Sequence, residues 1–91
     1  MAKLNLETVR KERVTDLMNE FFEYTDGFNK AVGRGEMFID CHEWQIHAAN
    51  AIHQVEDEGL LHMAKEMYPY EAELMKDYLD VYNEIQSGAR I

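Results

Sequence analysis

The feature that most constrains the fold is the spacing of apolar residues, which recur at intervals of three and four along nearly the whole chain. That spacing matches the 3.6-residue turn of an α-helix, whereas the two-residue alternation of a half-buried strand is missing. The 91 residues include one proline and five glycines, so few positions interrupt the pattern. The sequence therefore predicts a single all-α domain over residues 1–91, because so short a chain rarely divides into two domains.

The first helix is expected to begin at Asn5, whose side chain suits an N-cap. Two end points are open. The helix covers either 5–26, with Gly27 as a left-handed cap, or 5–32, with a turn beginning at Gly33.

The central helix is expected to be the longest, over 36–67, with the third helix over 70–87. Gly59 lies inside the central helix and is expected either to let another helix pack closely or to mark a bend. Pro69 fits the first turn of the third helix, and Gly88 is a natural stop for it.

One face of the central helix carries apolar and small side chains. A chain of this size buries only roughly 60 to 65% of its unfolded surface, yet 46% of its residues are apolar. We therefore expect a small three-helix bundle or helical hairpin whose core is completed by homo-oligomerisation, with a dimer as the first choice. At 100° per residue, the expected oligomer interface comprises Cys41, Trp44, Ala48, Ile52, Val55 and Gly59.

Charge is segregated along the chain. Residues 1–35 hold six basic and six acidic residues, whereas 36–91 hold three basic residues and twelve acids, so the second part carries the whole net charge of −9. Such a surface repels nucleic acid and anionic membranes and attracts a basic protein. The small basic patch of Arg10, Lys11 and Arg13 is expected to contact the acidic second part of the same chain or of a neighbour.

The third helix supplies the predicted partner-binding surface. Four acids line its face opposite the apolar seam, with two tyrosines as expected anchors at the edge. The predicted partner-binding residues are Glu73, Asp77, Asp80, Glu84, Tyr78 and Tyr82.

The leading functional hypothesis is a small, acidic, non-enzymatic interaction protein. It would bind and inhibit a basic partner, such as a nucleic-acid-binding protein, in the manner of accessory proteins of phages and mobile elements. No nucleophilic triad and no glycine-rich phosphate loop can be found in the sequence, so we expect neither an enzyme nor a cofactor.

Two alternatives stay open at this point. In the first, a carboxylate and an imidazole four residues apart bind a metal ion, and an antiparallel dimer brings two such pairs together. The second is a helical oligomer that binds a small ligand between its subunits. The candidate metal ligands are Glu43, His47, Glu58 and His62.

The remaining expectations concern location and pH. A single cysteine, Cys41, favours a reducing cytoplasmic setting, and no apolar run approaches the roughly 18 to 20 residues that a membrane span needs. His42 and His53 flank the apolar face of the central helix, which would make an association through that face sensitive to pH.

Overall fold

A computed structural model describes residues 5–35 and 38–88, and for residues 38–41 it describes the backbone alone. Within these ranges the chain is helical and has no strand, which confirms the predicted all-α class. The elements in order are α1 (Leu6–Gly33), α2 (Phe38–Asp57), α3 (Leu61–Met67), the short 3₁₀ helix η1 (Pro69–Glu71) and α4 (Ala72–Gln86).

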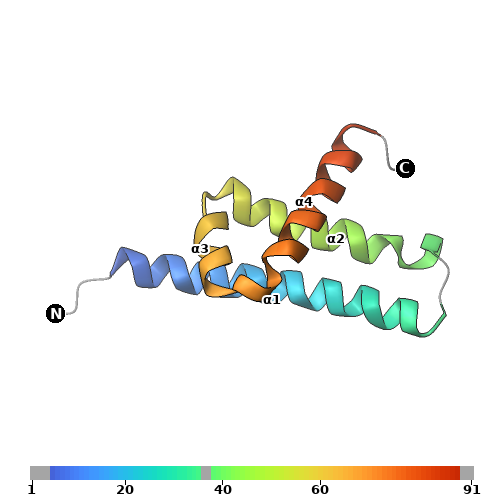
Figure 1. Cartoon of the computed structure of the whole chain (residues 1–91), viewed down its shortest axis with the longest axis horizontal. Coiled ribbons are helices and arrows are strands. Elements are labelled where there is room, and N and C mark those ends of the chain that lie inside the picture. Colours follow the sequence, from blue (N-terminus) through green and yellow to red (C-terminus); the bar gives the residue numbers. More distant parts are fainter. Residues whose placement is uncertain (1–4, 36–37, 89–91) are drawn as a thin grey trace.

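The architecture is an antiparallel hairpin crossed by a third long helix. Figure 1 shows α1 and α2 lying side by side, with α3 turning back from the end of α2 towards α1. From there α4 crosses the hairpin steeply, and its C-terminal end extends beyond α2. The chain is elongated, with principal extents of 54 × 29 × 21 Å.

Helix α1 agrees with the longer of the two predicted ranges for the first helix, 5–32, and not with 5–26. The Asn5 side-chain oxygen accepts a hydrogen bond of 2.9 Å from the backbone N–H of Glu7, which confirms the N-cap. The helix continues through Gly27, where the indole of Trp44 packs against the backbone. A Cβ atom at residue 27 would lie 2.6 Å from two atoms of that ring. Gly27 is therefore a contact position and not a cap.

The predicted central helix over 36–67 is two helices in the structure, and the longest helix is α1. Helix α2 ends at Asp57 and α3 begins at Leu61, with Gly59 between them at a φ of +74°. Glycine adopts this left-handed conformation readily, and a following backbone N–H, that of Leu60, donates to the Val55 carbonyl. Of the two expectations for Gly59, close packing is wrong: nothing lies within 4 Å of the place its Cβ would occupy.

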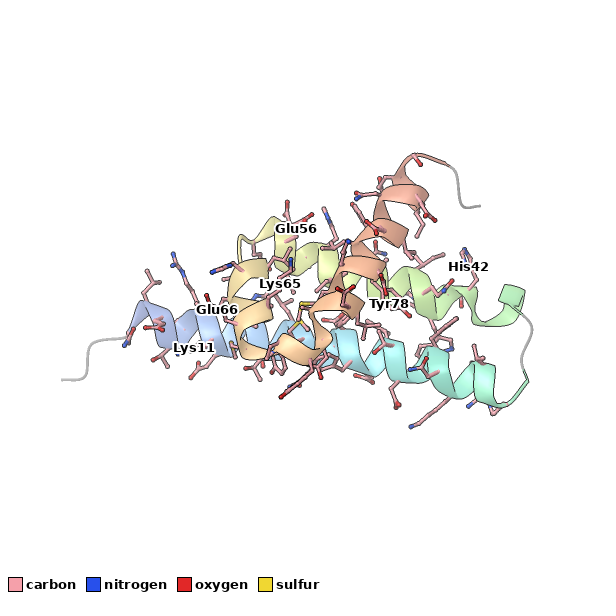
Figure 2. The ribbon with its side chains drawn as sticks, viewed as in Figure 1. Lys11, His42, Glu56, Lys65, Glu66 and Tyr78 are labelled. Atoms are coloured by element: carbon pink, nitrogen blue, oxygen red, sulfur yellow. The ribbon has the colours of Figure 1, made fainter. Side chains whose placement is uncertain are left out.

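The core lies where the hairpin, α3 and α4 meet. Phe21 of α1 contacts the Tyr78 ring of α4 edge-on, with ring centroids 5.5 Å apart, and Phe22 contacts Tyr68 similarly at 5.3 Å. Figure 2 shows Tyr78 near the crossing of α4 with the hairpin. The largest fully buried side chains are Phe21, Met18, Ile52, Met75, Val14 and Val55.

The α2 face that was expected to meet a second copy is covered within the chain. Ala48, Ile52 and Val55 have no exposed surface, because the chain's own helices pack on them. These side chains are core residues of one chain and offer no surface to a partner. Homo-oligomerisation itself stays a prediction, but it needs a different surface.

None of the helices described in residues 5–35 and 38–88 is both long enough and apolar enough to cross a membrane.

Candidate functional site

Four exposed carboxylates form an acidic stripe along the outer face of α4: Glu73, Asp77, Asp80 and Glu84. Their spacing confines them to a sector of about 60° that extends for about 16 Å along the helix. The opposite face of α4 carries Met75 and Tyr78, which are buried against the hairpin. The packing of α4 therefore turns the acidic stripe outward.

The two tyrosines that were expected to anchor a partner lie against the chain itself. Tyr78 is 8% exposed and belongs to the core, where burial raises the pKa of its phenol. Tyr82 is half-buried, and its ring stacks on that of His53 with centroids 3.8 Å apart and planes 8° apart. Both residues hold α4 on the hairpin, because they lie on its apolar face and not beside the acidic stripe.

Within one chain, the two Glu–His pairs are not combined into a metal site, and the site between two chains stays a prediction. Gly59 ends the helix between Glu58 and His62, so these residues no longer share a helix face. His62 instead pairs with Glu66 at 2.7 Å. Among the described residues, no group of three or more His, Cys, Asp or Glu side chains is placed to hold a metal ion.

Glu58 is bound by a residue of α1. The Arg13 guanidinium donates two hydrogen bonds to the Glu58 carboxylate, of 2.9 and 2.7 Å, and the Gln54 amide donates a third of 2.6 Å. These bonds, first those from Arg13, lower the pKa of Glu58 to about 2. One residue of the predicted basic patch thus contacts the acidic second part of its own chain.

A polar groove of about 390 Å³ runs along one edge of the α1–α2 hairpin. Both helices of the hairpin contribute side chains to its lining. Helix α4 does not line the groove, because it packs along the other edge, on Phe21 and His53. The lining residues are Arg13, Leu17, Glu20, Tyr24, His47, Asn50, Ala51 and Gln54.

A second cavity adjoins this groove. Two of the four residues that line the cavity, Tyr24 and His47, also line the groove. This cavity has a volume of about 320 Å³ and is lined by Tyr24, Glu43, Trp44 and His47. We call it the aromatic–acidic pocket. The rings of Tyr24 and Trp44 are tilted by 50° with centroids 6.5 Å apart, and His47 stacks on Tyr24 at 5.2 Å. Three rings and a carboxylate therefore surround one cavity.

The electrostatic environment of this pocket is negative. The Tyr24 hydroxyl donates to the Glu20 carboxylate at 3.4 Å. Burial, and then the charges of Glu20 and Glu23, raise the pKa of the Tyr24 phenol. Exposed Glu43 adds a carboxylate on the α2 side. An anionic group would meet repulsion here, whereas a cation would meet the Glu43 carboxylate and aromatic rings, which attract cations.

Comparison with protein-family models, with curated protein sequences and with solved structures found no match for this chain.

Sequence reasoning missed the aromatic–acidic pocket. It placed Trp44 on the apolar face of the central helix, but it had no means of finding which residues of α1 lie opposite. Gly27 was the available signal: a glycine inside a helical pattern often marks a close approach, and here it receives Trp44. Trp44 is half-buried against its own chain, and the side chain of Cys41 lies outside the described residues.

Proposed function

We propose that this protein is a small acidic interaction protein that binds a basic protein partner through α4 and inhibits it. The observation that carries the proposal is the exposed acidic stripe on a helix whose other face is fixed to the hairpin. The stripe is held in place before binding, so α4 itself would lose little conformational entropy when a partner binds.

The nature of the partner follows from charge. A chain with a net charge of −9 attracts basic proteins over a distance set by the ionic strength, and its own charge disfavours direct contact with nucleic acid. A stripe about 16 Å long is suited to a basic helix or groove that would otherwise hold phosphates. Covering such a surface would inhibit nucleic-acid binding by the partner.

The experiment compares capture by two variants of equal charge. Immobilised wild-type protein, Asp77→Asn/Asp80→Asn and Glu12→Gln/Asp16→Asn are incubated with lysate of the source cells. All four substituted residues are exposed, but the second pair lies on α1. We expect basic proteins to be captured by the wild type and by the α1 variant, and to be lost from the α4 variant.

Salt and nucleic acid provide two further readouts. Raising the salt from about 0.1 M to about 1 M shortens the screening length from about 10 Å to about 3 Å and should release the captured protein. The captured protein should then fail to bind its nucleic acid when the acidic chain is present in excess. Capture that is equal for both variants, or insensitive to salt, would contradict the proposal.

A further inference from the structure

We infer that the aromatic–acidic pocket (Tyr24, Glu43, Trp44 and His47) is a second contact site, which takes the cationic side chain of a lysine or arginine of the basic partner. This inference rests on the proposed function, since it names where one side chain of that partner enters. It places the site on the α1–α2 hairpin, whereas the acidic stripe lies on α4.

The rings supply the first part of the argument. Aromatic faces attract ammonium and guanidinium groups, and tryptophan does so most strongly. The Tyr24 and Trp44 rings are tilted by 50° and border the same cavity, so a cation in it can approach both. A volume of about 320 Å³ holds the end of a long side chain and leaves room for water.

The carboxylates supply the second part. Glu43 lines the pocket directly, and Glu20 lies beside the Tyr24 hydroxyl, which donates to it. Arg13, the cation of the neighbouring groove, is neutralised by its two hydrogen bonds to Glu58. The carboxylates of the pocket are thus not offset by an adjacent positive charge of that groove.

The pocket is also built in advance of binding. Trp44 packs against the backbone at Gly27, where a methyl group in place of hydrogen would collide with the indole. The Tyr24 ring is held by stacking on His47, with ring centroids 5.2 Å apart, and by the hydrogen bond from its hydroxyl to Glu20. Preorganised rings lose little rotamer freedom when a cation enters.

The chain carries its own reporter, because Trp44 is its single tryptophan. Purified full-length protein is titrated with N-acetyl-lysine amide and with N-acetyl-arginine amide while indole fluorescence is recorded. The indole N–H resonance provides a second readout. Sodium chloride of equal ionic strength and the amide of N-acetylglutamate are the controls for screening and for charge. We expect the lysine and arginine amides to bind saturably, with a Kd on the order of 10 mM, and neither control to do so.

Variants localise the binding. Glu43→Gln is expected to weaken lysine binding about threefold to tenfold, and Tyr24→Leu about tenfold. The matched control, Glu12→Gln, removes the same charge from the distant part of α1 and should leave binding unchanged. Far-ultraviolet circular dichroism checks that each variant is folded, and Glu43 is exposed, so its substitution disturbs no core contact.

The inference would be overturned by no saturable change, by an equal change with sodium chloride, or by an equal loss in Glu12→Gln and Glu43→Gln. Binding of tetramethylammonium without binding of the lysine and arginine amides would also overturn it, because the pocket would then take a small quaternary ammonium ion. If the titration fails while capture still depends on the acidic stripe, the pocket is excluded and the proposed function stands. If lysine binds while capture ignores the stripe, the pocket stands and the proposed function falls.

Discussion

Two glycines of α1 have different surroundings although both belong to the helix. Gly27 faces the indole of Trp44, and a Cβ atom there would lie 2.6 Å from the ring, whereas nothing lies within 4 Å of the corresponding position at Gly33. Neither residue has a positive φ. The difference between them is therefore one of space and not of backbone conformation.

This contrast predicts different results for two identical substitutions. Gly33→Ala should raise the free energy of unfolding by up to about 1 kcal/mol, which is the helix preference of alanine over glycine. Gly27→Ala should gain less or lose stability, because the methyl group pushes the indole outward. Urea denaturation measures the stability, and a red-shifted Trp44 emission in Gly27→Ala alone reports the displacement. Unshifted emission in Gly27→Ala would show that the indole does not pack there.

The Arg13–Glu58 pair predicts a pH dependence. Because the folded-state pKa of Glu58 is about 2, below its ordinary 4.5, the pair stabilises the fold above pH 4.5. This stabilisation is lost as the pH falls through 4.5 towards 2. Glu58→Gln should therefore lower the melting temperature at pH 7, and the difference from wild type should shrink between pH 4.5 and pH 2. A difference that does not change with pH would contradict the pairing.

At the scale of the element, Gly59 decides that one expected helix is two. Its φ of +74° lies in the region where a side chain costs about 1 to 2 kcal/mol. Gly59→Ala should lower the free energy of unfolding by about that amount, although there is ample room for the methyl group. Gly59→Asn should cost less, since asparagine tolerates this conformation. Equal stabilities of both variants and the wild type, measured by urea denaturation, would mean that α2 and α3 form one helix.

The docking of α4 depends on its buried face. Tyr78 contacts Phe21 in the core, whereas Tyr70 in η1 is 96% exposed. Tyr78→Ala should cost about 3 kcal/mol of unfolding free energy, in the range for large aromatic residues removed from a core. Tyr70→Ala is the matched control and should change stability by less than about 0.5 kcal/mol. If both cost the same, α4 does not pack as described.

The helices could largely be predicted because the signals that define them are local. The Asn5 cap, the turn beyond α1, Pro69 and the spacing of apolar residues act within a few positions. A bend at Gly59 was one of two alternatives, but the end of the helix there was not predicted, since a glycine in a helical pattern is equally consistent with close packing, a bend or a cap. Which apolar helix face packs against which other one depends on contacts between residues that are distant in the sequence. This is why the acidic residues of α4 were placed outward correctly, while Tyr78 and Tyr82 were assigned to a partner instead of to the hairpin.

At the scale of the whole molecule, the oligomeric state depends on which apolar surface the chain leaves uncovered. The face of α2 is not available, since Ala48 and Ile52 are fully buried. Leu6 and Val9 are 62% and 40% exposed on α1. They lie on the part of that helix that extends past α3, where Figure 2 shows Lys11. A second copy that packs here would not have to open the core.

A dimer therefore stays our prediction, with Leu6 and Val9 as its contact. Light scattering should give a mass near twice 10.7 kDa at high protein concentration, falling towards the single-chain mass on dilution. Leu6→Ser/Val9→Ser should be monomeric at the same concentrations, because it removes the apolar area and leaves the core intact. A mass of 10.7 kDa at every concentration for the wild type would exclude self-association.

The outer turns of α1 have a further consequence. Every described side chain from residue 5 to residue 13 is exposed. The backbone hydrogen bonds of these turns are therefore stabilised by helix propensity, the Asn5 cap and the Glu7–Lys11 ion pair, and Arg13 adds a contact to Glu58 in the turn after α2. Such turns can unwind from the end without opening the core, and their amide protons exchange with water through this local fraying. Amides near Phe21 exchange only when the hairpin itself opens. The same helix therefore combines a segment that is easily reshaped with a segment as stable as the fold.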